Sequence, residues 1–517
     1  MPTALTTARR TVVVSGDPLT TRDVIAVANG NARVRLTAAA TETMAKARAS
    51  VEALRDSPIA TYGLNTGVGA LADQVISPDR LLALQRSLLR SHAAGAGPRV
   101  EREVVRAMML LRTRTLATGV AGVRPAIAHA LIGLLNADLV PIVQEYGSLG
   151  CSGDLAPLAA VALALTGEGR LVAADGTESD AASALRRAGL QPLVLDAGEG
   201  LALINGTDGM LGMLVLAIDR LARLLDVADI TAAMSVEALQ GTDRVFAAEL
   251  QALRPHRGQA HSAARISALL HDSPILAAAR GRGVQDAYSL RCAPQVHGAA
   301  GDTVDHARGV AARELASVID NPAVLPDGRL ESNGNFHGAP LAYVLDFLAI
   351  AAADVASMCE RRTDRLLDPA RSAGLPAFLA ADSGVDSGLM IAHYTQASVV
   401  ADLKRLAAPA SVDSIPTSAM QEDHVSMGWA AGSKLLRALD GLTTVLAIEL
   451  LTAARALDLR APLRPSPATG AVVAALREHV PGPGPDRHLA PEIAATAHLI
   501  RDGALSAAAH QVTNPSP

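Results

Sequence analysis

The sequence is short of aromatic residues, although half of it is apolar. Among 517 residues there are one Trp, five Tyr and four Phe. The core must therefore consist mainly of Ala, Leu and Val, which suits close-packed helices better than a β-sandwich. A chain of this length can bury a large core, and we expect two or three coupled subdomains.

Basic charge, cysteine and long apolar runs are also scarce. The chain has 46 Lys and Arg against 51 Asp and Glu, so the basic surplus of a nucleic-acid-binding protein is missing. Cys151, Cys292 and Cys359 are too few and too scattered for a disulfide framework. No apolar run reaches the roughly 18 residues that would suggest a membrane span. We therefore expect a cytoplasmic protein that binds neither nucleic acid nor a membrane.

Apolar residues recur at helical spacing in three long segments, 210–234, 341–367 and 427–457. Shorter helices are expected within 81–116 and 126–139, a strand at 11–14, and irregular structure in the Pro- and Gly-rich stretch 460–485. Long helices of similar length pack side by side. The pattern predicts a mainly α fold, with an elongated long-helix bundle as its core and a smaller mixed N-terminal region.

Several common catalytic motifs are absent. The sequence has no H-E-x-x-H, no C-x-x-C and no G-x-x-x-x-G-K-[ST], and Asp154 stands where G-x-S-x-G would need its second Gly. The fourteen histidines show no metal-ligand spacing, so we expect no metal.

The most informative segment is the glycine-rich loop at residues 147–158. Gly153 has no Cβ, so its backbone nitrogen can approach the carbonyl carbon of Cys151 closely. Attack on that carbonyl and loss of water would give a five-membered ring, and loss of the Ser152 hydroxyl would add an exocyclic methylidene group. The alternative is an ordinary helix N-terminus, with Ser152 as the cap and Asp154 in the first turn.

This segment resembles the signature of the histidine and aromatic amino acid ammonia-lyase family, whose members build 4-methylideneimidazol-5-one (MIO) from Ala-Ser-Gly. Seven further segments resemble family motifs in the same order: 61–69, 84–95, 203–207, 285–292, 320–322, 334–338 and 411–426. The resemblance implies a mostly α-helical homotetramer in which three subunits contribute to each active site. It also implies that MIO forms autocatalytically from this chain, without a metal or a diffusible cofactor.

The resemblance also suggests three domains. Residues 1–205 would form an N-terminal domain that carries the catalytic Tyr loop and the MIO loop. Residues 206–460 would form the central long-helix bundle, and residues 461–517 an irregular and helical tail.

The resemblance assigns catalytic roles to five positions, one of which, Tyr288, also contacts the substrate and is described with the substrate-binding residues below. Cys151, Ser152 and Gly153 would form the MIO, and Tyr62 would be the base that removes the β-proton. An ordinary Tyr has a pKa of about 10, so positive charge near Tyr62 is expected to lower it.

Five positions would bind or surround the substrate. Arg291 would pair with the substrate carboxylate through two hydrogen bonds. Asn205 and Tyr288 match residues that hold the MIO carbonyl and the amine end, and Gln285 and Phe336 match residues that line the site. For Tyr288 the alternative is a half-buried structural tyrosine with a satisfied hydroxyl group.

Two positions bear on the substrate. Ser91-His92 and Glu422 resemble the histidine enzymes of the family. A pocket carboxylate can accept a hydrogen bond from an imidazole N–H, whereas against a phenyl ring it would be desolvated without a partner. The resemblance therefore implies conversion of L-histidine to trans-urocanate. The alternative is that Glu422 caps a helix or pairs with an Arg.

The chain departs from the family pattern at five positions. Cys151 replaces Ala, Val68 replaces Phe, Asp208 stands where Gln is usual, Ala160 where His is usual, and Met420 where Asn is usual. Val68, Asp208 and Met420 would line or back the site. These departures leave open a tyrosine or phenylalanine ammonia-lyase and a 2,3-aminomutase.

Two hypotheses that assign the chain to other classes of protein remain. A silent scaffold paralogue should have lost the Ser-Gly pair, Tyr62 or Arg291, and all of these are present. A fumarase-like helical lyase without MIO would share the all-α tetramer, but its signature loop is not visible in the sequence.

Overall fold

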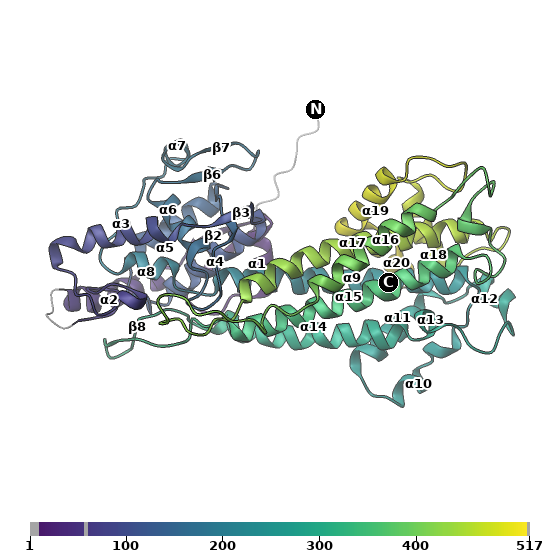
Figure 1. Cartoon of the computed structure of the whole chain (residues 1–517), viewed down its shortest axis with the longest axis horizontal. Helices are drawn as coiled ribbons and strands as arrows, with labels where there is room; N and C mark the ends of the chain where they lie inside the picture. Colours follow the sequence, from purple (N-terminus) through teal and green to yellow (C-terminus); the bar gives the residue numbers. More distant parts are fainter. Residues whose placement is uncertain (1–9, 56–59, 514–517) are drawn as a thin grey trace. The chain divides into compact units, whose positions relative to one another are not determined.

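The computed structural model describes residues 10–55 and 60–513 (Figure 1). It has the mainly α fold that the sequence predicts, with long helices and a few short strands. The chain divides into two compact units. The first contains the chain up to Leu216, Arg308–Leu345 and Pro409–Ser433, and the second contains Ala217–Ala307, Asp346–Ala408 and the chain from Lys434 onward. The three domains expected from the sequence, with boundaries at 205 and 460, stay a prediction.

The three long helices predicted from apolar periodicity are present. They are α9 (Asp208–Ala238), α15 (Ala339–Leu367) and α17 (Gly428–Asp458). Four of the five boundaries between the two units fall inside a long helix, one each in α9, α14 (Ala293–Ala316), α15 and α17. The fifth, between Ala408 and Pro409, lies just after α16 (Met390–Leu406).

Helix α14 was not predicted, because polar residues and glycines interrupt its apolar pattern. The structure explains one of those glycines. A Cβ on Gly298 would lie 2.3 Å from the backbone nitrogen of Gln259 in α11 (Arg257–Leu269), and one on Gly258 would lie 2.1 Å from the Gly298 carbonyl oxygen. The two backbones approach so closely that neither position has room for a side chain.

The shorter helices of the first unit lie N-terminal to α9. They are α1 (Thr21–Ala28), α2 (Ala38–Arg55), α3 (Leu81–His92), α4 (Arg102–Ala117), α5 (Pro125–Asn136), α6 (Leu155–Leu165), α7 (Ala181–Arg187) and α8 (Glu199–Ile204). The second unit adds α10 (Ala248–Ala252), α12 (Pro274–Ala279), α13 (Tyr288–Arg291), α16 (Met390–Leu406), α18 (Pro467–Arg477), α19 (Ala490–Asp502) and α20 (Ala504–Thr513).

The strands form small sheets in the first unit. The strand expected at 11–14 is β1 (Arg10–Val14), which pairs in parallel with β2 (Ala32–Leu36). The other pairs are antiparallel: β3 (Ala96–Arg99) with β5 (Gln144–Tyr146), β4 (Val140–Pro141) with β6 (Arg170–Val172), β6 with β7 (Glu178–Asp180), and β8 (Ala323–Val324) with β9 (Leu330–Glu331).

One expectation about local structure was wrong. The stretch 460–485 was expected to be irregular, but it contains α18 (Pro467–Arg477). Pro467 stands in the first turn, where a missing N–H costs nothing, and the Ser466 hydroxyl caps the helix by accepting from the Thr469 amide at 3.1 Å. The buried Glu237 carboxylate also accepts from the Ser466 amide at 2.6 Å.

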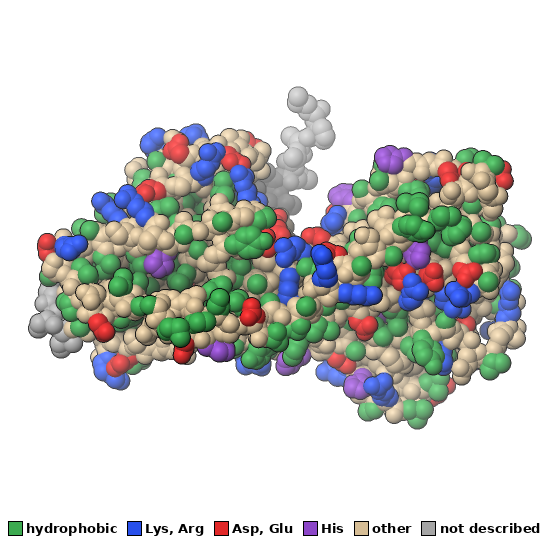
Figure 2. All heavy atoms as spheres, in the orientation of Figure 1, with side chains coloured by type: hydrophobic (Ala, Val, Ile, Leu, Met, Phe, Trp, Pro, Cys, Tyr) green, Lys and Arg blue, Asp and Glu red, His purple; other side chains and the backbone are tan. Residues whose placement is uncertain are grey.

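Apolar helices of this length raise the question of a membrane span. The segments Glu199–Ala238 and Ala339–Leu367 are long and apolar enough to cross a membrane by length and composition alone. The most apolar 18-residue window is 94% buried inside the fold in the first segment and 61% buried in the second. Core helices of globular proteins show the same burial. On the face shown in Figure 2, basic and acidic side chains are interspersed over each unit.

Candidate active site

A cavity of about 660 Å³ in the first unit brings together most of the predicted site residues. Those that line it are Tyr62, His92, Cys151, Ser152, Asn205, Phe336 and Glu422. They come from segments far apart in the sequence, each next to the end of a helix or in a connecting loop. Loops on a helical scaffold therefore build this cavity.

The Cys151-Ser152-Gly153 loop is tightly folded. Gly150 and Gly153 have φ angles of +65° and +78°, and a Cβ on Gly153 would lie 2.3 Å from the Gly206 carbonyl oxygen. Only glycine fits there. The Gly150 carbonyl oxygen accepts from the Ser426 hydroxyl at 2.7 Å and from the Gly338 amide at 2.9 Å. On the other side of the tripeptide, the Asp154 amide donates to the Gly206 carbonyl oxygen at 2.7 Å, so the loop is held at both ends.

The loop does not place Ser152 as a helix cap. Helix α6 begins at Leu155, its N-cap residue is Asp154, and no side chain caps it. Ser152 instead turns its hydroxyl toward Glu422, to which it donates a hydrogen bond at 2.8 Å. The helix-cap alternative for Ser152 is therefore wrong.

The Glu422 carboxylate is the polar centre of the cavity. It accepts hydrogen bonds from the Ser152 hydroxyl, from the Cys151 thiol at 3.2 Å and from the Thr417 hydroxyl at 3.1 Å. Burial and then the Glu422 charge raise the pKa of the Cys151 thiol to about 12. The Glu422 carboxylate therefore faces the Cys151-Ser152-Gly153 tripeptide, and its hydrogen bonds go to that loop and to Thr417. The alternative, in which Glu422 caps a helix or pairs with an Arg, does not describe these contacts.

His92 lies at the end of α3. Its Nδ1 is 2.9 Å from the Leu88 carbonyl oxygen, which accepts a hydrogen bond from that nitrogen and leaves Nε2 as the acceptor of a neutral ring. Burial lowers the pKa of His92, against the opposing effects of the Leu88 carbonyl and the Glu422 charge. A neutral His92 can therefore accept a hydrogen bond at Nε2.

Asp154 ties the loop to the first turn of α9. Its carboxylate accepts from the Gly209 and Met210 amides at 2.8 and 3.0 Å and from the Ser148 hydroxyl at 3.0 Å. The side chain is fully buried, and burial raises its pKa to about 7 although these hydrogen bonds lower it. The partial positive charge of a helix N-terminus favours a carboxylate at this position.

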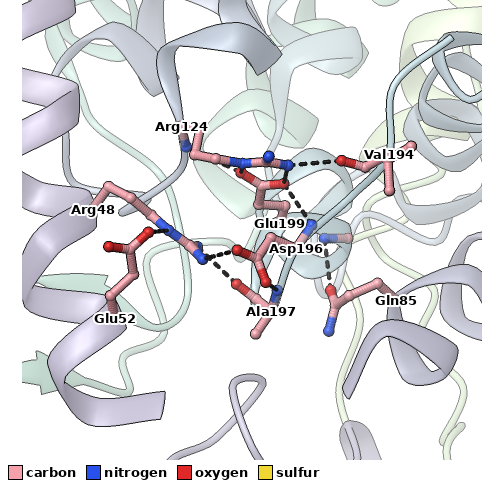
Figure 3. A network of polar contacts seen from close by, with 9 residues as sticks. Arg48, Glu52, Gln85, Arg124, Val194, Asp196, Ala197 and Glu199 are labelled. Atoms are coloured by element: carbon pink, nitrogen blue, oxygen red, sulfur yellow. Dashed lines mark hydrogen bonds and ion pairs between the residues drawn. The ribbon is translucent and has the colours of Figure 1, made fainter. Parts of the chain in front are cut away.

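A polar network fixes the start of α8, the short helix that leads to Asn205 (Figure 3). The fully buried Glu199 carboxylate accepts from Arg124 Nε at 2.8 Å, from Arg124 Nη2 at 2.6 Å and from the Asp196 amide at 2.7 Å. Arg48 donates to the Asp196 carboxylate, and Gln85 Oε1 accepts from the Gly200 amide, each at 2.8 Å.

The end of α8 is fixed as well. Arg112 donates to the Asn205 carbonyl oxygen at 3.2 Å, and the Asn205 side-chain nitrogen donates to the Asn321 carbonyl oxygen at 2.7 Å. Asn205 Oδ1 is buried without a hydrogen-bond partner in the protein. With both ends of α8 anchored, Asn205 presents one free acceptor at the cavity.

Arg112 is a site-supporting residue that the sequence did not reveal. It is buried between the Asp208 and Asp320 carboxylates, at 3.3 and 3.1 Å. Burial raises the pKa of both acids, that of Asp320 to about 7, and the Arg112 charge opposes the shift. Two features of the sequence could have revealed this role of Arg112: it stands among the apolar residues of α4, and Asp208 stands where the family usually has Gln.

The departures from the family pattern fall in different places. Val68 lines the cavity, as expected. Asp208 backs it through Arg112, as expected of a residue behind the site. Met420 is 66% exposed and is not among the described residues that line the cavity. Ala160 lies within α6.

The remaining predicted residues belong to the second unit. Gln285 precedes α13, which carries Tyr288 and Arg291, and none of the three is among the lining residues of the 660 Å³ cavity. The Arg291 guanidinium lies over the Tyr288 ring at 4.7 Å, in a cation–π contact. Tyr288 is 70% exposed, so the half-buried structural alternative does not hold.

Comparisons with known proteins agree with this site. The family model for aromatic amino acid lyase matches residues 19–478. Histidine ammonia-lyase of Streptomyces avermitilis is 59% identical over 508 residues, which is 98% of this chain and 99% of that protein. Histidine ammonia-lyase of Streptomyces griseus is 60% identical over 510 residues, with 98% and 99% covered.

Two solved structures share the fold. Tyrosine aminomutase from Streptomyces globisporus superposes with a TM-score of 0.91 at 36% identity, over 98% of this chain and 99% of that one. Histidine ammonia-lyase from Trypanosoma cruzi superposes with a TM-score of 0.89 at 37% identity, over 97% of this chain and 95% of that one. The chain is a carbon–nitrogen lyase. It belongs to the aromatic amino acid lyase family, which confirms the resemblance drawn from the motifs.

Proposed function

We propose that this chain eliminates ammonia from L-histidine to give trans-urocanate. The observation that carries the proposal is Glu422, whose carboxylate faces Ser152 in the cavity that His92 also lines. The two histidine ammonia-lyases from Streptomyces, at 59% and 60% identity, support histidine as the substrate. The tyrosine aminomutase shares the fold at a lower 36% identity.

The tripeptide Cys151-Ser152-Gly153 fits the formation of MIO. A residue larger than glycine has no room at 153. The Glu422 carboxyl group, hydrogen-bonded to the Ser152 hydroxyl, lies where it could deliver a proton to that oxygen, so that the hydroxyl would leave as water while the Ser152 Cα gives up its own proton. Only the backbone carbonyl of Cys151 takes part in ring closure, so the thiol does not prevent it. When present, MIO supplies an electrophilic methylidene carbon that takes the substrate amine.

The other side chains bind the substrate and move its proton. Tyr62 lines the same cavity as Ser152, and its hydroxyl oxygen accepts from the Gly69 amide at 3.2 Å, which orients the side chain whose phenolate oxygen would take the β-proton. The unpartnered Asn205 Oδ1 accepts a hydrogen bond from the substrate amine. Glu422 and His92 supply acceptors for the imidazole ring, and Phe336 packs beside it.

A homotetramer with shared sites completes the proposal. The described residues that line the cavity include no Lys or Arg, although the substrate carboxylate needs a cation and Tyr62 needs positive charge nearby. Arg291, with Tyr288 and Gln285, supplies these groups from a neighbouring subunit. The three cysteines are free thiols, which fits a reducing cytoplasm.

The test begins with the mass of the protein. Intact mass should fall short of the sequence mass by two waters, with the loss in the peptide that contains Cys151–Gly153. Ser152→Ala should abolish this loss and reduce urocanate formation by several orders of magnitude. Ser332→Ala, which changes a serine of the same cavity outside the loop, is the matched control and should leave both unchanged.

Four outcomes would contradict the proposal. Full activity from an unmodified wild-type peptide would exclude MIO. Deamination of tyrosine or phenylalanine in preference to histidine would identify a different lyase, and accumulation of β-amino acids would identify an aminomutase. Absence of all turnover by a correctly modified protein would favour a silent scaffold paralogue.

A further inference from the structure

A buried ion pair in the second unit plays no part in the site described above. Arg362 in α15 and Glu449 in α17 have side chains that are both fully inaccessible to solvent. Arg362 donates to the Glu449 carboxylate from Nε at 2.5 Å and from Nη2 at 3.1 Å, a bidentate arrangement. The carboxylate also accepts from the Thr231 and Ser235 hydroxyls of α9 at 2.8 and 3.0 Å.

Such a pair is a poor device for stability alone. The desolvation of two charges costs nearly as much free energy as their mutual attraction provides. Apolar residues of similar volume at the same positions often stabilise a fold equally well. The pair is, however, a rigid one. Six hydrogen bonds on the two groups, which include the Nη2 contact to the Cys359 sulfur at 3.1 Å, fix the plane of the guanidinium among three helices.

The remaining arm of Arg362 points to the segment with the predicted carboxylate-binding residue. Its Nη1 donates to the Ser289 carbonyl oxygen at 3.2 Å. Ser289 lies in α13, between Tyr288 and Arg291. A four-residue helix is too short to be stable by itself, so its backbone takes its position from contacts of this kind.

Arg291 itself has few contacts that would fix it. It stacks on the Tyr288 ring, and its Nε is buried without a hydrogen-bond partner. Tyr288 is largely exposed and offers little rigidity. The position of the Arg291 guanidinium therefore depends on the backbone of α13.

We propose that Arg362, held by Glu449, is a positioning residue for α13, and through it sets where Arg291 meets the substrate carboxylate. This inference rests on the proposed function, which assigns Arg291 to that carboxylate. It adds a residue that does not touch the substrate but governs how well one end of the substrate is held.

The test compares two ligands that differ in the carboxylate. Arg362→Lys keeps a positive charge but loses the planar fork, so it cannot hold Glu449 and the Ser289 carbonyl together. We expect the inhibition constant of urocanate to rise about tenfold, as for the loss of one charge-assisted contact, and that of imidazole to stay within twofold. KM for histidine should rise more than kcat falls.

A matched control makes the same chemical change elsewhere. Arg460 of the second unit also donates from a partly buried guanidinium to backbone carbonyls, those of Ala238, Ala373 and Ser372. Arg460→Lys should leave the ratio of the two inhibition constants unchanged, even if it lowers stability. If Arg362→Lys does not fold, Glu449→Gln keeps the shape of the acceptor and should give the same selective loss.

The outcomes separate this inference from the proposed function. If urocanate does not inhibit the wild-type enzyme, the proposed function fails. If urocanate inhibits the wild type but the Arg362 and Glu449 variants weaken both ligands equally, or neither, the positioning role is wrong. In an Arg291→Gln background, Arg362→Lys should no longer change urocanate binding, and an undiminished effect there would overturn the inference.

Discussion

Glu422→Gln tests the substrate assignment most directly, because the substitution changes charge with almost no change in shape. The carboxylate accepts from the Ser152 hydroxyl, the Cys151 thiol and the Thr417 hydroxyl, and the last two donors remain once MIO formation has removed the Ser152 hydroxyl. The amide has one acceptor and one donor. An imidazole N–H would then compete with the hydroxyl and thiol groups for a single oxygen.

The magnitude follows from the hydrogen bond that weakens. A bond to a charged acceptor contributes about 1.5–3 kcal/mol and a neutral one about 0.5–1.5 kcal/mol. The difference of about 1–2 kcal/mol predicts a loss of roughly 5- to 30-fold in kcat/KM for histidine. The kcat/KM for phenylalanine and for tyrosine should not fall, and we expect it to rise, because their rings no longer face an unpaired carboxylate.

The assay must separate catalysis from formation of the prosthetic group, since Glu422 also contacts the Ser152 hydroxyl. Rates should be expressed per chain that has lost two waters, measured by intact mass. Asp423→Asn makes the same change of charge at the next residue, which also lines the cavity, and should leave the preference unchanged. An unchanged kcat/KM for histidine in fully modified Glu422→Gln would refute the assignment.

Three further predictions concern the base, the assembly and the pH dependence of stability. Tyr62→Phe removes the proton acceptor and should lower kcat by about 10²-fold or more, and a change in KM alone would argue against the role. Tyr62→Phe and Arg291→Ala subunits, each inactive alone, should regain activity when co-expressed, whereas verified mixed tetramers without recovery would place both residues on one chain. The pKa of Asp320 is raised to about 7, so between the unfolded-state pKa near 4 and pH 7 the native chain holds one proton more than the unfolded chain. Its contribution to stability is therefore full below pH 4 and declines as the pH rises to 7. Asp320→Asn should flatten that part of the curve in urea denaturation, and an unchanged slope would count against the shifted pKa.

Much of the fold could be predicted because three long helices carry a continuous apolar stripe. Burial of that stripe is the dominant driving force, so periodicity alone placed α9, α15 and α17 within a few residues. Helix α14 escaped prediction because its interface is made by backbone contact at Gly298, where no side chain provides a signal. Helix α18 was missed because Pro467 favours a helix start as much as a loop.

The candidate site could be predicted in its residues but not in its connections. Local motifs identified Ser152 and Glu422 separately, and only the fold shows that a hydrogen bond joins them. Arg112 and Arg362 act through partners about 90 or more positions away, such as Asp208 and Glu449. A pattern read along the chain has no means of pairing such distant charges.

The buried thiol of Cys151 has a practical consequence for labelling the protein. With a pKa of about 12, only about one thiol in ten thousand is ionised at pH 8, and the thiolate is the species that alkylating reagents attack. Cys359 is fully buried, and burial raises its pKa as well. Cys292 is only partly buried and directly follows Arg291. A maleimide dye would therefore attach beside α13, the segment proposed to bind the substrate carboxylate, without any engineered cysteine.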